Sequence, residues 1–148
     1  MSEIAHLAKR FVLNLVPSQV HDIERQWVHS VLSQDESALW NSMMVQDRRH
    51  SVMVGRRFVK LRPTASQGEI AGALLHDVGK SAARLGTFAR VLATLVGPRT
   101  NRFRQYHDHE KIGATMLRSI GSNELTVSMV EGSCEGELRQ ALNRADDI

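Results

Sequence analysis

Apolar residues recur every three or four positions along most of the chain, which is the spacing that lines one face of an α-helix. No alternating apolar and polar run of strand length interrupts this pattern, and residues that favour helices dominate. Each of the three prolines falls between two periodic segments, where it would end a helix: Pro17, Pro63 and Pro98. The pattern therefore predicts an all-α fold with about seven to nine helices.

Capping signals fix several of the expected helix starts. Ser33 and Glu36 stand three residues apart, as do Ser66 and Glu69, and this spacing is typical of a capping box. Asp108 is expected to cap a later helix. Helices are predicted at 2–15, 18–31, around residues 39–40, and at 47–62, 66–76, 88–96, 108–120, 123–131 and 135–147, with loops at 77–86 and 99–106. We expect one globular unit, in which residues 1–45 form a helical extension packed on a core of residues 46–148.

The composition narrows the class of protein. A chain of 148 residues is the size of one domain. It carries 19 lysines and arginines against 16 acidic residues, and the arginines form small groups rather than one basic stripe, which disfavours a nucleic-acid partner. No apolar run approaches the roughly 20 residues of a membrane span. The single cysteine, Cys134, excludes an internal disulfide and an all-cysteine zinc site. We therefore expect a soluble cytoplasmic protein without a membrane partner.

The candidate chemistry is concentrated in His76-Asp77-Val78-Gly79-Lys80, at the predicted exit of an apolar helix. A neutral imidazole and a carboxylate side by side offer one nitrogen and one oxygen to the same point, a mixed set that suits hard or borderline divalent ions. Gly79 would release the chain from helical geometry and let Asp77 turn toward such an ion. Two ligands do not make a stable site, so others must come from distant helices.

Two further residues qualify as such ligands. His50 precedes apolar residues at i+4, i+8 and i+11, so it points into the core, where an unpaired imidazole would be costly. Asp146 follows an apolar stripe on the last predicted helix, and Asp147 could take its place if that helix rotates.

Together, His50, His76-Asp77 and Ala145-Asp146 resemble the H…HD…D signature of the HD-domain superfamily of metal-dependent phosphohydrolases. Residues 74–80 resemble the central motif of that family, and residues 109–114 resemble the H-x-x-x-G-A segment that follows it in many members. The resemblance covers about residues 46–148. The residues before them are similar to the opening of small, stand-alone bacterial HD proteins.

The resemblance implies one divalent metal ion (Mn, Fe, Co, Ni, Zn or Mg), held by His50, His76, Asp77 and Asp146. It also implies that His109 either ligates a second metal or contacts the phosphate of a substrate, with His107 competing for that place. Dinuclear members carry a further histidine one helix later, where this chain has residues 131–134 and no histidine beyond position 109. The expected site is therefore mononuclear.

The resemblance further implies hydrolysis of a small phosphorylated metabolite, with a nucleotide as the favoured substrate class. A bound divalent ion lowers the pKa of its water and polarises a phosphoryl oxygen. Asp77 would orient or deprotonate that water, and Lys80 would place a positive charge against the phosphate. Arg84, and one of Arg48 or Arg49, are lesser candidates for the phosphate contact.

Gly113-Ala114 departs from the Gly-Tyr-Pro variant of the cyclic-dinucleotide phosphodiesterases, which disfavours that substrate. Two alternatives to the enzyme stay open. One is a catalytically silent HD module that binds a nucleotide or a protein partner, because folds of this kind also serve as regulators. The other is a plain helical interaction domain whose ion is structural. The set of four ligands favours the enzyme over the interaction domain.

Overall fold

The computed structural model describes residues 19–80 and 102–147, and for residues 102–108 it describes the backbone only. Within these ranges it contains helices and no strand, which confirms the predicted all-α fold. The helices are α2 (Asp22–Val31), α3 (Gln34–Ser42), α4 (Val45–Leu61), α5 (Gln67–Leu75), α7 (Arg102–Ser119), α8 (Glu124–Glu131) and α9 (Gly136–Asp146). The helices predicted at 2–15 and 88–96 lie outside the described residues.

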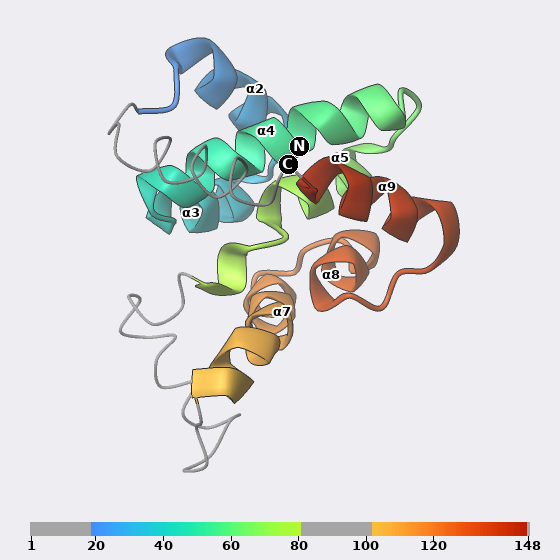
Figure 1. Ribbon diagram of the computed structural model, residues 1–148. Coiled ribbons are helices and arrows are strands. Elements are labelled where there is room, and N and C mark those ends of the chain that lie inside the picture. The colour runs from blue at the N-terminus through green and yellow to red at the C-terminus, as the bar shows by residue number, and fades with distance from the viewer. Residues whose placement is uncertain (1–18, 81–101, 148) are drawn as a thin grey trace, which may run out of the picture.

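Helix α5 lies at the centre of the described structure, and α4 and α8 pack on it from two sides (Figure 1). Helix α7 packs on α8, and α9 packs on α4. This arrangement brings the end of α5, one face of α4 and one face of α9 to the same side of the molecule. No helix in the described ranges is long and apolar enough to cross a membrane.

Both predicted capping boxes are present. The side chain of Ser33 accepts a hydrogen bond from the backbone of Glu36, and the carboxylate of Glu36 accepts one in return from the backbone of Ser33. Ser66 and Glu69 make the same reciprocal pair at the start of α5. These bonds satisfy amides that a helix start otherwise leaves unpaired, so they fix where α3 and α5 begin.

Two apolar clusters form the core. The larger one joins residues of α2 and α3, including the fully buried Val28 and Trp40, to residues of α5, α7 and α8. Trp40 also donates a hydrogen bond from Nε1 to Oγ of Ser51 on α4, at 2.8 Å. The described part of residues 1–45 is thus packed on the other helices, while the boundary of the extension stays a prediction.

The smaller cluster joins α4, α5, α8 and α9. It contains Val54 and Phe58 of α4, Ala73 of α5, and Ala145 of α9, all of them fully buried. This apolar contact fixes the position of the last turn of α9 against the middle of α4, next to His50.

Two predicted helix starts are wrong. The helix expected from Ser18 begins only at Asp22, because residues 19–21 are not helical and His21, just before the helix, has an extended backbone. The segment 99–106 was expected to be a loop and Asp108 a cap, but α7 already begins at Arg102 and Asp108 lies inside it. Residues 102–107 contain no glycine or proline that would stop a helix, so the chain is helical well before the residue that looked like its cap.

Candidate metal centre

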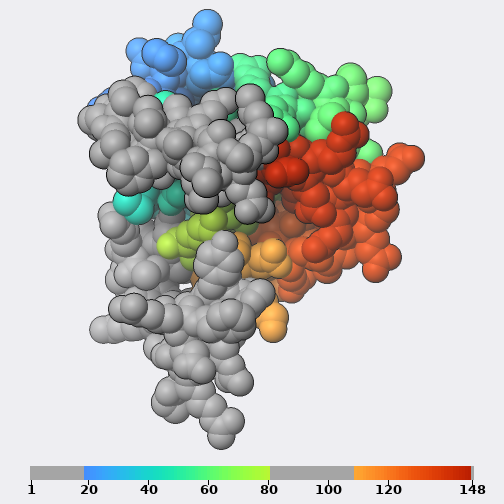
Figure 2. Space-filling view, in the orientation of Figure 1, coloured from blue at the N-terminus to red at the C-terminus, as the bar shows by residue number. Residues whose placement is uncertain are grey.

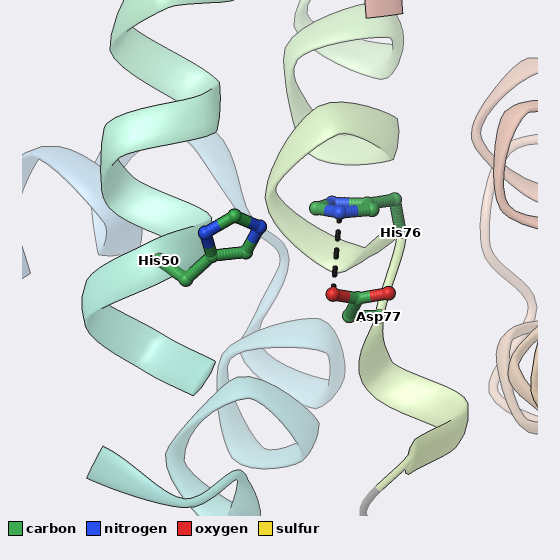
Figure 3. A group of neighbouring side chains, drawn as sticks. All are labelled: His50, His76 and Asp77. Atoms are coloured by element: carbon green, nitrogen blue, oxygen red, sulfur yellow. Dashed lines mark ion pairs between the residues drawn. The ribbon is translucent and has the colours of Figure 1, made fainter. Parts of the chain in front are cut away.

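Two helices, α4 and α5, bring the histidines and the first aspartate of the motif together. His50 projects from α4, His76 is the residue at which α5 ends, and Asp77 follows it in a turn (Figure 3). Nitrogen atoms of His50 and His76 and a carboxylate oxygen of Asp77 all lie within 4.8 Å of one another. Ligand atoms that share an ion at roughly 2.1 Å lie roughly 3 to 4.3 Å apart, so the spacing suits a metal.

Asp146 joins the same cluster from α9. Its Oδ1 lies 2.8 Å from Nε2 of His50 and 3.3 Å from Nε2 of His76. Asp147 follows the end of α9, and both aspartates are exposed, so it is the contacts of Asp146 that distinguish the two. The structure thus places Asp146, rather than its neighbour, against both histidines.

The end of α9 is held by an arginine that the sequence did not single out. Nη2 of Arg57 donates hydrogen bonds to the backbone oxygens of Arg144, at 3.0 Å, and Asp147, at 3.2 Å. These two carbonyls flank Asp146 in the chain. Arg57 lies seven residues after His50, which is two turns along α4, so both residues lie on one face of that helix.

The ring of His76 has one nitrogen tied to the backbone and the other directed into the cluster. Nδ1 donates to the carbonyl oxygen of Ala73, at 2.8 Å, which leaves Nε2 as the atom that faces the carboxylates. Nε2 is buried and, when protonated, lies within ion-pair range of Asp77 and Asp146, but the described residues give it no hydrogen bond of normal geometry. A buried nitrogen without a hydrogen bond is costly. A divalent ion coordinated there would satisfy it, so the residues present fit a metal.

The pKa values of the clustered residues also favour a bound cation. Burial lowers the pKa of His76, but the contacts with Asp146 and Asp77 outweigh it and raise the pKa to about 10. The contacts with His50 and His76 hold the pKa of Asp146 well below its usual range. Burial raises the pKa of Asp77, yet His76 and Lys80 lower it further than burial raises it. Two carboxylates therefore stay ionised around one point and attract positive charge to it.

Asp77 uses both of its oxygens. Oδ2 lies 3.4 Å from Nε2 of His76 and 3.0 Å from Nζ of Lys80, while Oδ1 lies 3.7 Å from Nε2 of His109 on α7. The predicted catalytic and ligand residues His76, Asp77, Lys80 and His109 are thus neighbours. The side chain of His107 and the whole of Arg84 lie outside the described part. Arg48 stacks on Trp40, with its guanidinium carbon 5.7 Å from the ring centre.

Gly79 is required for a different reason from the one predicted. The φ angle of Gly79 is not positive, and residues 78–80 form a single 3₁₀ turn, so the backbone conformation does not require glycine. A Cβ at Gly79 would overlap the backbone carbonyl of His109 and lie 2.8 Å from the backbone nitrogen of Gly113. The absence of a side chain at Gly79 lets the turn after Asp77 touch α7 and keeps His109 near the cluster.

A pocket of about 200 Å³ opens beside these residues. Five of its lining residues were candidates from the sequence: His76, Asp77, Lys80, His109 and Asp146. Figure 2 shows parts of the elements that supply lining residues, with the residues up to 80 in yellow-green, α7 from residue 109 in orange and α9 in red. Sequence reasoning missed other lining residues, among them Glu110, Cys134, Arg139 and Asn143. The signal was available for Arg139 and Asn143, because they precede Asp146 by seven and three residues and so share its helix face.

The comparisons with known proteins gave one finding. A family model described as HD domain matches residues 48–146, which spans α4 to the end of α9 and includes all the residues of the cluster. Neither the comparison with curated proteins nor that with solved structures gave a match.

Proposed function

Because the chain belongs to the HD-domain family, we propose that it is a metal-dependent phosphohydrolase that acts on a small phosphorylated metabolite, with a nucleotide as the favoured class. The observation that carries the proposal is the buried Nε2 of His76, which faces two ionised carboxylates and lacks a hydrogen bond. The pocket beside it is small, since pockets for drug-sized ligands enclose roughly 300–1,000 Å³.

Four residues would hold one divalent ion: His50, His76, Asp77 and Asp146. When bound, such an ion supplies a Lewis acid for the phosphoryl oxygen and lowers the pKa of water at the site. The reaction adds water to phosphorus and breaks the P–O ester bond, so that an alcohol and inorganic phosphate leave.

Asp77 and Lys80 are the proposed catalytic residues. Asp77 stays ionised, and its oxygen Oδ1 faces His109, so it can orient an attacking water by accepting a hydrogen bond. The Lys80 side chain is 39% exposed, and its Nζ is held at 3.0 Å from Asp77 at the pocket. This placement brings a positive charge to the position that a phosphate oxygen would occupy. His109 would contact the phosphate from α7.

Metal counting tests the proposal. We expect about one divalent transition metal per chain in the purified protein and close to none in Asp77→Ala, because ligand removal weakens a site built from side chains of separate helices. The matched control is Asp147→Ala, which removes a neighbouring acid that lies outside the cluster and should retain the metal. Helical content by circular dichroism should be the same in all three proteins.

The same preparation is then assayed against p-nitrophenyl phosphate and nucleoside monophosphates. We expect hydrolysis that Asp77→Ala abolishes. Full metal occupancy in Asp77→Ala would contradict the assignment of the site. A protein that holds one metal and binds nucleotide without hydrolysing any ester would instead be the silent binding module.

A further inference from the structure

The pocket carries a second set of polar groups, here called the wall, which the proposed function does not use. Glu110 comes from α7, and Arg139 and Asn143 come from α9. Seven residues separate Arg139 from Asp146, which is roughly 10 Å along the helix axis. Arg139 is therefore placed to contact the part of a substrate that lies away from its phosphate, and Asn143, three residues before Asp146, lies between the two along α9.

An acceptor and a donor converge at the same point of this wall. A methyl group added at Gly132 would lie 2.7 Å from Oε2 of Glu110 and 3.4 Å from Nη1 of Arg139. Nη1 of Arg139 also donates to the backbone oxygen of Gly132, which fixes the guanidinium in place. A guanidinium has five N–H donors, so this bond orients the group without exhausting it. Asn143, one turn after Arg139, adds an amide that both donates and accepts.

The chemistry of this set selects among ligand groups. A hydroxyl both donates and accepts, so it can pair with the Glu110 carboxylate and with Arg139 or Asn143. A second phosphate or a carboxylate would meet the negative charge of Glu110. A nucleobase usually needs a stacking surface, but among the described lining residues the apolar ones are Met129, Val130 and Leu142, with no Phe, Tyr or Trp. The wall is thus best matched by sugar hydroxyls.

We infer that Glu110, Arg139 and Asn143 bind the hydroxyl groups of the sugar that carries the scissile phosphate. This inference rests on the proposed function, because it takes the phosphate end to lie at the His–Asp cluster. Two substrates share the chemistry, namely a free sugar phosphate and the ribose of a ribonucleotide. The three residues determine specificity, and we assign them no part in breaking the bond.

Pairs of substrates that differ by one hydroxyl test the inference on the manganese-loaded chain of 148 residues. Ribose 5-phosphate is compared with 2-deoxyribose 5-phosphate, and adenosine 5′-monophosphate with its 2′-deoxy analogue, by kcat/KM. We expect the hydroxylated member to be favoured by about tenfold, which corresponds to about 1.4 kcal/mol. The pair with the higher kcat/KM identifies the source of the sugar.

Glu110→Gln and Arg139→Ala should each reduce this preference at least fivefold. The matched controls are Glu137→Gln and Arg144→Ala, which change the same residue types on exposed positions of α9 outside the pocket and should retain the wild-type ratio. Equal rates for both members of each pair, or a ratio that survives in Glu110→Gln and Arg139→Ala, would overturn the inference.

Failure of the proposed function is distinguishable. If the metal-loaded protein hydrolyses neither these esters nor p-nitrophenyl phosphate, the hydrolase proposal fails. The sugar phosphates and nucleotides then stay intact, so their binding can be measured directly. Calorimetric dissociation constants for the same two pairs then replace kcat/KM. A tighter hydroxylated member, with the difference lost in Glu110→Gln, would still support the hydroxyl-binding wall, and equal constants would overturn it.

Discussion

His76 combines three properties, and each has a separate structural cause. The carbonyl of Ala73 fixes its Nδ1, the surrounding helices bury its Nε2, and two carboxylates face that nitrogen. In the absence of a metal, the positive charge that these carboxylates attract is a proton, which is why the pKa of His76 is raised to about 10 even though burial lowers it. A metal and a proton therefore compete for one atom.

This competition predicts the pH dependence of metal binding. The folded, metal-free protein keeps the His76 proton from the unfolded pKa of 6.5 up to about 10. Between these values Nε2 must release a proton to coordinate, so affinity for the metal should rise with pH and binding at pH 8 should release close to one proton. Asp77 and Asp146 have lowered pKa values, are already ionised and should release none.

Calorimetric titration with manganese in two buffers of different ionisation enthalpy measures the number of protons released. The His76→Ala variant is the control and should lose this proton along with most of the affinity. Binding of undiminished strength with no proton release at pH 8 in the wild-type protein would show that His76 is not protonated in the metal-free state.

At the scale of single residues, the sequence indicated which side chains belong to the cluster, but it did not always indicate why a residue is needed there. The grouping of His50, His76, Asp77 and Asp146 could be predicted, because their spacing follows a motif and their helix faces follow the apolar pattern. The role of Gly79 could not, since a local pattern indicates flexibility at a glycine but does not show that another helix touches it. The close contact with His109 depends on residues thirty positions away in the chain.

Helix α4 contacts the end of α9 in two ways, through a side chain and through the backbone. His50 of α4 touches the side chain of Asp146, while Arg57 of the same helix holds the backbone oxygens on either side of it. Because a helix leaves its last carbonyls unpaired, Arg57 serves as the C-terminal cap of α9. It is a positioning residue that acts through Asp146.

Removing this cap should loosen Asp146 without unfolding the protein. We expect Arg57→Ala to weaken manganese binding by roughly tenfold, which corresponds to about 1.4 kcal/mol. Arg56→Ala is the matched control, because Arg56 pairs with Glu24 and stacks over Trp27, away from α9. It should lower the unfolding temperature and leave the metal dissociation constant unchanged. Equal effects of the two substitutions on metal affinity would show that Arg57 has only a general structural role.

The elements themselves were predictable where a side chain signals a boundary. The two Ser-x-x-Glu boxes start α3 and α5 as expected, and α8 and α9 begin within one residue of their predicted starts. The start of α7 was missed because Asp108 is a good cap by residue type, yet nothing before it ends the helix. A cap residue favours a helix start only where the preceding chain leaves helical geometry.

Considered as a whole, the molecule gathers the proposed ligands from three helices. An ion bound by His50, His76, Asp77 and Asp146 would link α4, the end of α5 and α9, which otherwise share the smaller apolar cluster. Ligands that bind only the folded state stabilise it. Metal removal should therefore lower the unfolding temperature of the entire described unit.

At a metal concentration of about 100 times the dissociation constant, the stabilisation is about 2.7 kcal/mol. For a chain of this length that corresponds to a rise of roughly 5–10 °C in Tm. Differential scanning calorimetry before and after chelation, with manganese added back, measures it. The Asp77→Ala protein should show no change on either treatment, and a wild-type Tm that is insensitive to chelation would contradict a linking ion.

The pocket could not be predicted at this scale from sequence. Its lining residues come from the end of α5, from α7 and from the α8–α9 region. Only the packing of these helices shows that Glu110 and Arg139 line the same pocket. The sequence did mark residues 131–134 as the place where related dinuclear proteins carry a histidine. Gly132 and Cys134 do line the pocket there, without an imidazole.

The pairing of His50 with Asp146 spans 96 residues of chain. A contact of such long range closes a large loop and forms late, because its entropic cost is met only once the intervening helices have packed. During synthesis, α4 and α5 emerge before α9 and carry His50, His76 and Asp77 as an incomplete site, to which α9 adds the fourth side chain afterwards. Tight capture of the ion would then coincide with the docking of α9, so that the loaded metal marks a chain that has completed folding.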